Sequence, residues 1–247
     1  MGPTPPTCET HRLPHAERAG PYNRGVEQRP RFADLTVASF VDRLASNEPI
    51  PGGGSAAAVA GSLAAGLVAM VASLSQDRPR YAQHAALHAE TMSAARELAD
   101  RLLALADEDA SAYAQFGAAM KMPKETEAER TARSAAIAEG ARAASDAPFR
   151  TIQACATVVR YAEALAGRSN RNASSDLEVA SLLAVAASRA AAANVYVNLP
   201  SIGDEEVGRD LHQQTEELAD EVERLASLTR ELVRSGDSRD PLEDAPG

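Results

Sequence analysis

The chain has 247 residues, and its 25 Lys and Arg against 35 Asp and Glu give a formal net charge of −10. This length is enough for one domain with a substantial core, and the acidic balance argues against a nucleic-acid-binding module, which needs a basic face. Hydrophobic residues supply 45% of the chain, but aromatic residues supply only 4% and tryptophan is absent. Alanine makes up about a fifth of the sequence, which favours closely packed helices and excludes a β-rich domain. We therefore predict an all-α protein.

Helical periodicity continues along most of the chain. Residues 1–31 contain six prolines and no apolar period, so we expect a disordered or loosely docked extension, with a disordered tail at residues 235–247. The helical domain between them spans residues 32–234. Thr126 and Glu129 match a capping box for one helix, which Pro148 is expected to interrupt or kink. The expected helices cover residues 35–45, 55–74, 81–120, 126–147, 148–166, 175–198 and 205–233, which predicts a multihelical bundle.

Two of these helices, over residues 55–74 and 177–199, are apolar on nearly every side. Such a helix is buried in a core, in a partner subunit or in lipid. The first is built of Ala, Gly and Ser with few larger side chains, has no aromatic belt and no flanking basic cluster, and partitions weakly into hydrocarbon. We therefore expect no membrane span. Because few helices remain to cover these two, we predict that homodimerisation completes the bundle.

The cysteine and histidine residues do not indicate a metal centre. Cys8 and Cys155 lie far apart in the sequence, and no Cys-x-x-Cys or Cys/His cluster suggests a disulfide framework or a zinc site. His84 and His88 are four residues apart on one helix face, but a third ligand is lacking, so an exposed polar face is expected and no metal. The N-terminal residues lack the layout of a secretory signal, and we expect a cytoplasmic protein.

The first candidate site is the glycine run that enters the first apolar helix. Gly53, Gly54 and Ser55 precede a stretch of alanines. Free backbone N–H groups at the start of a helix favour a carboxylate or another polar group of a ligand. The alternative is purely structural: Ser55 caps the helix and the glycines permit a tight turn.

The second candidate is the acidic run that contains Asp107 and Asp109, inside a helix otherwise rich in Leu and Ala. Asp109 and Tyr113 are four residues apart and share a helix face. A half-buried carboxylate on that face would favour its protonated form and would suit proton transfer. The alternative is a solvated acidic surface turn.

The third candidate is the polar turn between two apolar helices. Ser175 and Glu178 have capping-box spacing, which explains part of the pattern structurally. The remaining amide and acid groups suit a ligand that bears an amide or a heteroaromatic ring, although an internal hydrogen bond between helices is the alternative for the amide in the following helix. The candidate binding residues of this turn and that helix are Asn170, Asn172, Asp176 and Asn194.

These stretches together resemble the cyclodeaminase/cyclohydrolase family, which includes the cyclodeaminase domain of formiminotransferase-cyclodeaminase and bacterial methenyltetrahydrofolate cyclohydrolases. The resemblance extends over residues 34–233. The motifs that carry it, in order, are Pro51–Gly61, Asp107–Tyr113, Met122-Pro123-Lys124, Asn170-x-Asn172, Ser175-Asp176-Leu177 and Asn194–Leu199.

The resemblance implies an all-helical homodimer that acts on a tetrahydrofolate derivative as substrate, with no permanently bound cofactor and no metal. The two reactions of the family both pass through a tetrahedral carbon between two nitrogens, so they need proton transfer. Asp109 would then be the general acid/base, assisted by Tyr113 or Asp107. The implied substrate-binding residues are Gly53, Gly54 and Ser55 for a polar part of the ligand, and Asn170, Asn172 and Asp176 for the pterin or the one-carbon group.

Some positions depart from the family pattern. Ser169 stands where the family usually has Gly, and the Pro-rich N-terminal extension differs from compact members. Two alternatives follow. The chain is a diverged enzyme for a non-folate amidine, imine or cyclised substrate in a biosynthetic pathway, or it is a helical dimer that binds a ligand without catalysis.

Overall fold

The computed structural model describes residues 30–242, and its elements belong to the unit formed by residues 31–247. No strand occurs within that described range, which confirms the all-α prediction. The five long helices are α2 (Gly53–Ser75), α3 (Ala85–Met120), α4 (Glu127–Leu165), α5 (Ser174–Asn198) and α6 (Glu205–Ser235). A short helix α1 (Val37–Leu44) precedes them, and the 3-10 turns are η1 (Phe32–Asp34), η2 (Pro79–His84), η3 (Arg171–Ala173) and η4 (Leu199–Ser201).

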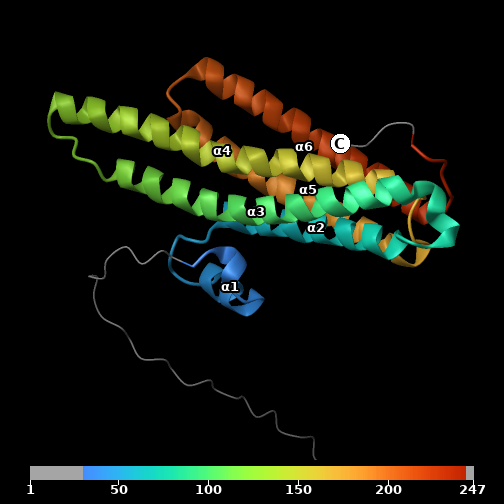
Figure 1. The fold of residues 1–247 in the computed structure, drawn as a ribbon. Helices are drawn as coiled ribbons and strands as arrows, with labels where there is room; N and C mark the ends of the chain where they lie inside the picture. The colour runs from blue at the N-terminus through green and yellow to red at the C-terminus, as the bar shows by residue number, and fades with distance from the viewer. Residues whose placement is uncertain (1–29, 243–247) are drawn as a thin grey trace, which may run out of the picture. The chain divides into compact units, whose positions relative to one another are not determined.

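The long helices lie side by side and alternate in direction (Figure 1). The α3–α4 and α5–α6 connections lie toward one end of the bundle, and the α2–α3 and α4–α5 connections lie at the other end. Helix α2 packs against α3, α4 and α5, and α6 covers α4 and α5. Each end of the bundle therefore gathers segments that are distant in the sequence.

Small side chains allow these helices to approach closely. A Cβ atom added at Gly61 of α2 would lie 3.1 Å from both Leu102 of α3 and Cys155 of α4. Leu102 and Cys155 are themselves fully buried. The alanine-rich composition therefore builds the core through short distances between helix axes.

Helix α4 begins as predicted and continues further than predicted. The Thr126 hydroxyl accepts a hydrogen bond from the Glu129 amide in a complete capping box. The expected interruption at Pro148 is wrong, because one helix runs through it. Proline has no amide to donate to the carbonyl four residues earlier, and the Asn198 side chain of α5 donates to that carbonyl, on Ala144, at 3.1 Å.

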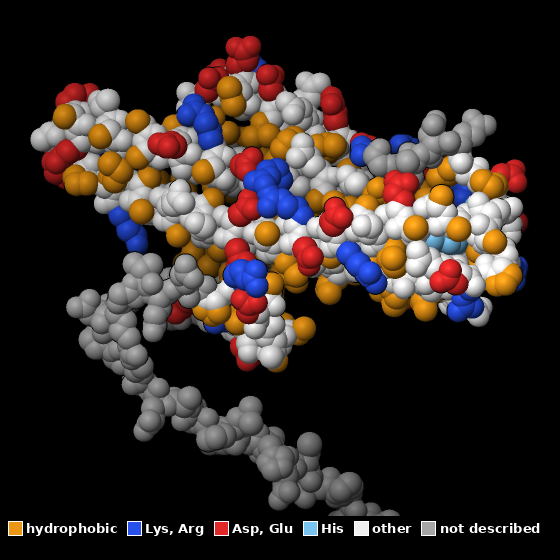
Figure 2. Space-filling view, viewed as in Figure 1, with side chains coloured by type: hydrophobic (Ala, Val, Ile, Leu, Met, Phe, Trp, Pro, Cys, Tyr) orange, Lys and Arg blue, Asp and Glu red, His pale blue; other side chains and the backbone are white. Residues whose placement is uncertain are grey.

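Two segments, Gly53–Ser75 and Arg171–Ser201, are long and apolar enough to cross a membrane by length and composition alone. Of the most apolar 18-residue stretch of each, 50% and 44% is buried in the bundle. The exposed positions of α2 and α5 carry no charge. On α2 they include Leu63, Met70 and Leu74, and on α5 Val179, Leu182 and Val197. In contrast, charged side chains are scattered over the face on which α3 and α4 lie (Figure 2).

We expect Asn198→Ala to lower the free energy of unfolding by about 1–3 kcal/mol, because the buried Ala144 carbonyl loses its donor. In a Pro148→Ala background the restored amide serves that carbonyl, so the same substitution should cost at least about 1 kcal/mol less. Urea unfolding of the four proteins measures both costs. Equal costs in the two backgrounds would contradict this account of Pro148.

Candidate functional site

The first turn of α2 lies directly against Asp109 of α3. Gly52 is the N-cap and Gly53 the first helical residue. A Cβ atom added at Gly54 would lie 2.2 Å from Oδ1 of Asp109, a distance that atoms do not tolerate. Glycine is therefore required at this position because the carboxyl of Asp109 occupies the space of a side chain.

Ser55 fixes the other oxygen of the same carboxyl. Its side chain is fully buried, and its hydroxyl lies 3.0 Å from Oδ2 of Asp109 and 3.0 Å from the Ala106 carbonyl. Ser55 is the third residue of α2 and not its cap, so the purely structural interpretation of Ser55 as a helix cap is wrong.

This arrangement accommodates both protonation states of Asp109. When the carboxyl is ionised, the Ser55 hydroxyl can donate to it. When the carboxyl is protonated, it can donate to the Ser55 oxygen while the serine proton turns to the Ala106 carbonyl. The pair can therefore release and recover a proton without leaving a buried polar atom unpaired.

The surroundings of Asp109 shift its acidity toward neutral pH. Burial raises the pKa of the Asp109 carboxyl, while hydrogen bonds from the Ser55 hydroxyl and backbone amide offset part of that rise. Asp109 as a residue is half-buried and not enclosed, so another molecule can reach it. A carboxyl of raised pKa, held in place and accessible, is suited to general acid/base catalysis.

The other members of the acidic run have different surroundings. Oδ1 of Asp107 accepts a hydrogen bond from the Phe32 amide at 2.9 Å and so ties the N-terminal segment to α3. Glu108 pairs with Arg101 and Arg150. Of the three acids, only Asp109 meets the glycine turn.

Tyr113 follows Asp109 by one turn of α3 and is 50% exposed. Its hydroxyl has no hydrogen bond to another residue of the described chain, so nothing fixes its orientation toward Asp109. Its predicted assisting role, like that of Asp107, stays a prediction.

Asn194 approaches the glycine turn from α5. A Cβ at Gly53 would lie 3.7 Å from Nδ2 of Asn194. That nitrogen donates to the Ala190 carbonyl within α5, which leaves the side-chain oxygen of Asn194 available to a ligand. The hydrogen bond between helices that was the alternative for Asn194 is made instead by Asn198, to α4.

Asn170, Asn172 and Asp176 lie at the opposite end of the bundle. The backbone amide of Asn170 donates to the Ser75 hydroxyl at the C-terminal end of α2 at 2.8 Å. The turn that contains Asn170 is therefore about 33 Å from Gly53, the length of α2. Within one chain these three residues therefore do not lie beside the glycine turn. Helix α4 ends at the far end of α2, and α5 must run its full length before it reaches the site at Asn194.

The structure differs from two further predictions. Helix α5 begins at Ser174 without a side-chain cap, and Glu178 pairs with Arg234 at 2.6 Å, so no capping box forms at Ser175. His84 and His88 are buried rather than exposed. Burial lowers the pKa of both imidazoles, and Nε2 of His88 bonds the Arg168 carbonyl. Within residues 30–242, no three metal-ligating side chains gather into one group.

One atom of the site could not be predicted from residue types. It is the backbone carbonyl oxygen of Ala106, which accepts a hydrogen bond from the Ser55 hydroxyl. The only available signal was position, because Ala106 lies one helical turn before Asp109.

Comparison with known proteins identifies the family. The profile of the family described as formiminotransferase-cyclodeaminase matches residues 36–217. The chain belongs to this family. The matched range includes Gly53, Gly54, Ser55, Asp109 and Asn194, and the resemblance drawn from the sequence motifs is confirmed.

Three members of the family illustrate the similarity. The chain is 35% identical to a methenyltetrahydrofolate cyclohydrolase of Methylorubrum extorquens over 200 residues, which cover 81% of this chain and 96% of that protein. It is 29% identical to a formimidoyltransferase-cyclodeaminase of Gallus gallus, over 87% of this chain but only 39% of that protein. The crystal structure of a formiminotetrahydrofolate cyclodeaminase from Thermotoga maritima matches with a TM-score of 0.75 and 25% identity, over 82% of this chain and 98% of that one.

We expect Gly54→Ala to lower the free energy of unfolding by about 1–3 kcal/mol, because the new methyl group must displace the Asp109 carboxyl. In an Asp109→Ala background the obstacle is gone and the cost should largely disappear. Gly117→Ala on α3 is the control, since nothing lies within 4 Å of its Cβ position; it should be neutral or stabilising by up to about 1 kcal/mol. Thermal or urea unfolding measures each change. A cost of Gly54→Ala that persists without Asp109 would refute the proposed contact.

Proposed function

We propose that the protein is a folate one-carbon enzyme that opens the methenyl bridge of 5,10-methenyltetrahydrofolate by hydrolysis, with Asp109 as the group that transfers protons. The observation that carries this proposal is the Asp109 carboxyl, held between Gly54 and Ser55 with a raised pKa. The cyclohydrolase relative, which the chain matches over 96% of its length, supports the choice of reaction.

The chemistry needs one group that first accepts and then donates a proton. Water adds to the methenyl carbon and gives up a proton to ionised Asp109, forming a tetrahedral carbon between the two nitrogens. Asp109 returns that proton to one nitrogen as its bond to carbon breaks. The hydroxyl on the carbon loses its own proton to solvent and becomes the carbonyl of 10-formyltetrahydrofolate. Ser55 can follow Asp109 through both states.

Cyclodeamination of 5-formiminotetrahydrofolate is the second candidate. It is supported by the match to the Thermotoga maritima cyclodeaminase, which covers 98% of that chain. In that reaction the second nitrogen of the folate attacks the formimino carbon and ammonia leaves, so Asp109 would protonate the leaving nitrogen. Assays of the purified chain with both folates separate the two reactions. Turnover of neither would favour a non-folate substrate or a binding protein.

We further propose that the active form is a homodimer joined through the uncharged faces of α2 and α5. The exposed positions of α5 are Ser175, Val179, Leu182, Ala186, Ala190, Ala193 and Val197, which follow one stripe at helical spacing. The exposed positions of α2 beside it also lack charge. An uncharged face that spans two packed helices supports pairing with a second copy.

A homodimer also gives the distant asparagines a role. With a twofold axis perpendicular to α2 near its middle, the N-terminal end of each α2 faces the C-terminal end of its partner. Asn170 and Asn172 of the partner subunit would then approach Gly53 and Asp109. Each site would combine a proton-transfer group from one subunit with amides from the other.

The cytoplasmic location and the lack of a permanently bound cofactor stay predictions of the sequence. The proton transfers above need only side chains of this protein, with the tetrahydrofolate derivative as substrate.

We expect Asp109→Asn to lower kcat/KM for methenyltetrahydrofolate by on the order of 10²–10⁴-fold, because the amide cannot accept or donate the transferred proton. Loss of the near-ultraviolet absorbance of the substrate measures the rate. Glu97→Gln, an exposed acid on the same helix, is the control and should stay within about threefold of the original rate. The role of Asp109 would be refuted if its variant kept a similar rate.

We expect Leu182→Asp to convert the dimer to a monomer, because it places a charge in the centre of the uncharged face. Light scattering after size exclusion measures the mass, and the same absorbance assay should show that the monomer has lost turnover. Val207→Asp, at a 43% exposed position on α6, should leave both properties unchanged. A monomeric variant with full activity would exclude a site shared between subunits, and a wild-type chain that is itself monomeric would exclude the dimer.

A further inference from the structure

A small cavity lies at the end of the bundle where Asn170 is found, well away from Asp109 of the same chain. Segments from η2, the α4–α5 turn, the start of α5 and the end of α6 surround it. Its volume of about 40 Å³ has room for roughly three water molecules. This space suits a small ion and is too small for a pterin ring.

Two arginines bring positive charge to this cavity. Arg80 and Arg171 both line it, and neither forms an ion pair with a residue in the described part of the chain. Tyr81 connects them, because its hydroxyl accepts the Arg171 amide at 3.1 Å and its ring lies 5.7 Å from the Arg80 guanidinium carbon. Two guanidinium groups without ion pairs therefore make this cavity positive in a chain of net charge −10.

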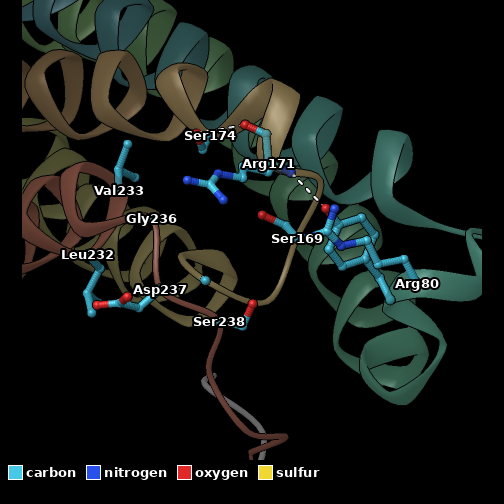
Figure 3. A pocket seen from close by; sticks show the side chains of 11 residues that line it. Arg80, Ser169, Arg171, Ser174, Leu232, Val233, Gly236, Asp237 and Ser238 are labelled. Carbon is cyan, nitrogen blue, oxygen red and sulfur yellow. Dashed lines mark hydrogen bonds between the residues drawn. The ribbon is translucent and has the colours of Figure 1, made fainter.

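Ser169 lies between the two arginines, and its hydroxyl is directed into the cavity (Figure 3). Ser169 as a whole is only 7% exposed, and no residue within 30–242 forms a hydrogen bond with its hydroxyl. That hydroxyl is therefore a donor that a molecule in the cavity can use. Ser174, the first residue of α5, also lines the cavity, so the positive end of that helix faces the same space.

We propose that this cavity binds a small dianionic oxyanion, a phosphate or dicarboxylate group, through Arg80, Arg171 and Ser169. A guanidinium group can donate two parallel hydrogen bonds to two oxygens of a phosphate or carboxylate. The Ser169 hydroxyl supplies a further donor that no other residue of the described chain uses. The start of α5 adds a favourable dipole.

Two negative features of the protein lie near Arg171: the Asp237 carboxylate and the C-terminal end of α6. Asp237 lines the cavity, but its carboxylate is turned away from Arg171 (Figure 3). Gly236 ends α6, and a Cβ there would lie 2.7 Å from Arg171. Arg171 therefore also lies near the negative end of α6, and stabilisation of that helix end is the competing explanation for its position.

Isothermal titration of the full chain in a Tris chloride buffer tests the proposal, with inorganic phosphate and succinate as the two probes. We expect saturable binding of one probe or both, at one ion per subunit. Arg171→Ala should weaken binding at least about tenfold, and Ser169→Ala, which keeps the charge, about fivefold. Arg209→Ala on α6 removes the same charge elsewhere and should change nothing.

The titration results distinguish the possible ligands and can refute the site. Binding of phosphate alone identifies a phosphate group as the ligand, and binding of succinate alone identifies a carboxylate. Absence of saturable binding by both probes overturns the site, as does equal weakening by Arg209→Ala and Arg171→Ala. If Arg171→Ala lowers the melting temperature but leaves affinity unchanged, Arg171 serves only the end of α6 and the site is again refuted.

Discussion

The contact between the Asp109 carboxyl and the first turn of α2 is the interaction on which the rest of the site depends. One oxygen fills the space that a side chain at position 54 would take, and the other meets the Ser55 hydroxyl. Burial at this contact raises the pKa of the carboxyl, which would otherwise be an ordinary surface acid. A glycine, a serine and an aspartate on two helices thus form a proton-transfer pair, and the chemistry follows from their packing.

The contact requires helices that approach closely, and the composition of the chain provides this. Gly61, one and a half to two turns after Ser55, lies against both Leu102 and Cys155, so α2 is held close to α3 and α4 along its length. The same small residues leave α2 and α5 with outward faces that have no charge. The same small residues therefore have two effects. They allow the packing that forms the site within one chain, and they leave the uncharged surface through which two chains are proposed to pair.

Much of the fold was predictable from the sequence because helical periodicity and capping are local. The helix positions and the Thr126 cap were predicted correctly for this reason. The errors arose where a distant residue changes a local preference. Helix α4 continues through Pro148 because Asn198 serves the free carbonyl, and Ser55 bonds Asp109 instead of capping its own helix. Residue types marked Asn170 as a candidate binding residue but not where it lies along the bundle, which depends on the direction and length of α4 and α5.

The acidity of Asp109 in the folded protein is the most direct measure of the central contact. A ¹³C NMR titration of the chain labelled at aspartate carboxyl carbons, with Asp109→Asn to assign the signal, gives its pKa. The expectation from this contact is a value above the ordinary aspartate pKa of about 3.9, and a further rise in Ser55→Ala because the hydroxyl that favours the ionised form is gone. A value at or below the ordinary one in the wild-type chain would contradict it, since Asp109 would then be a solvated carboxylate with no special role.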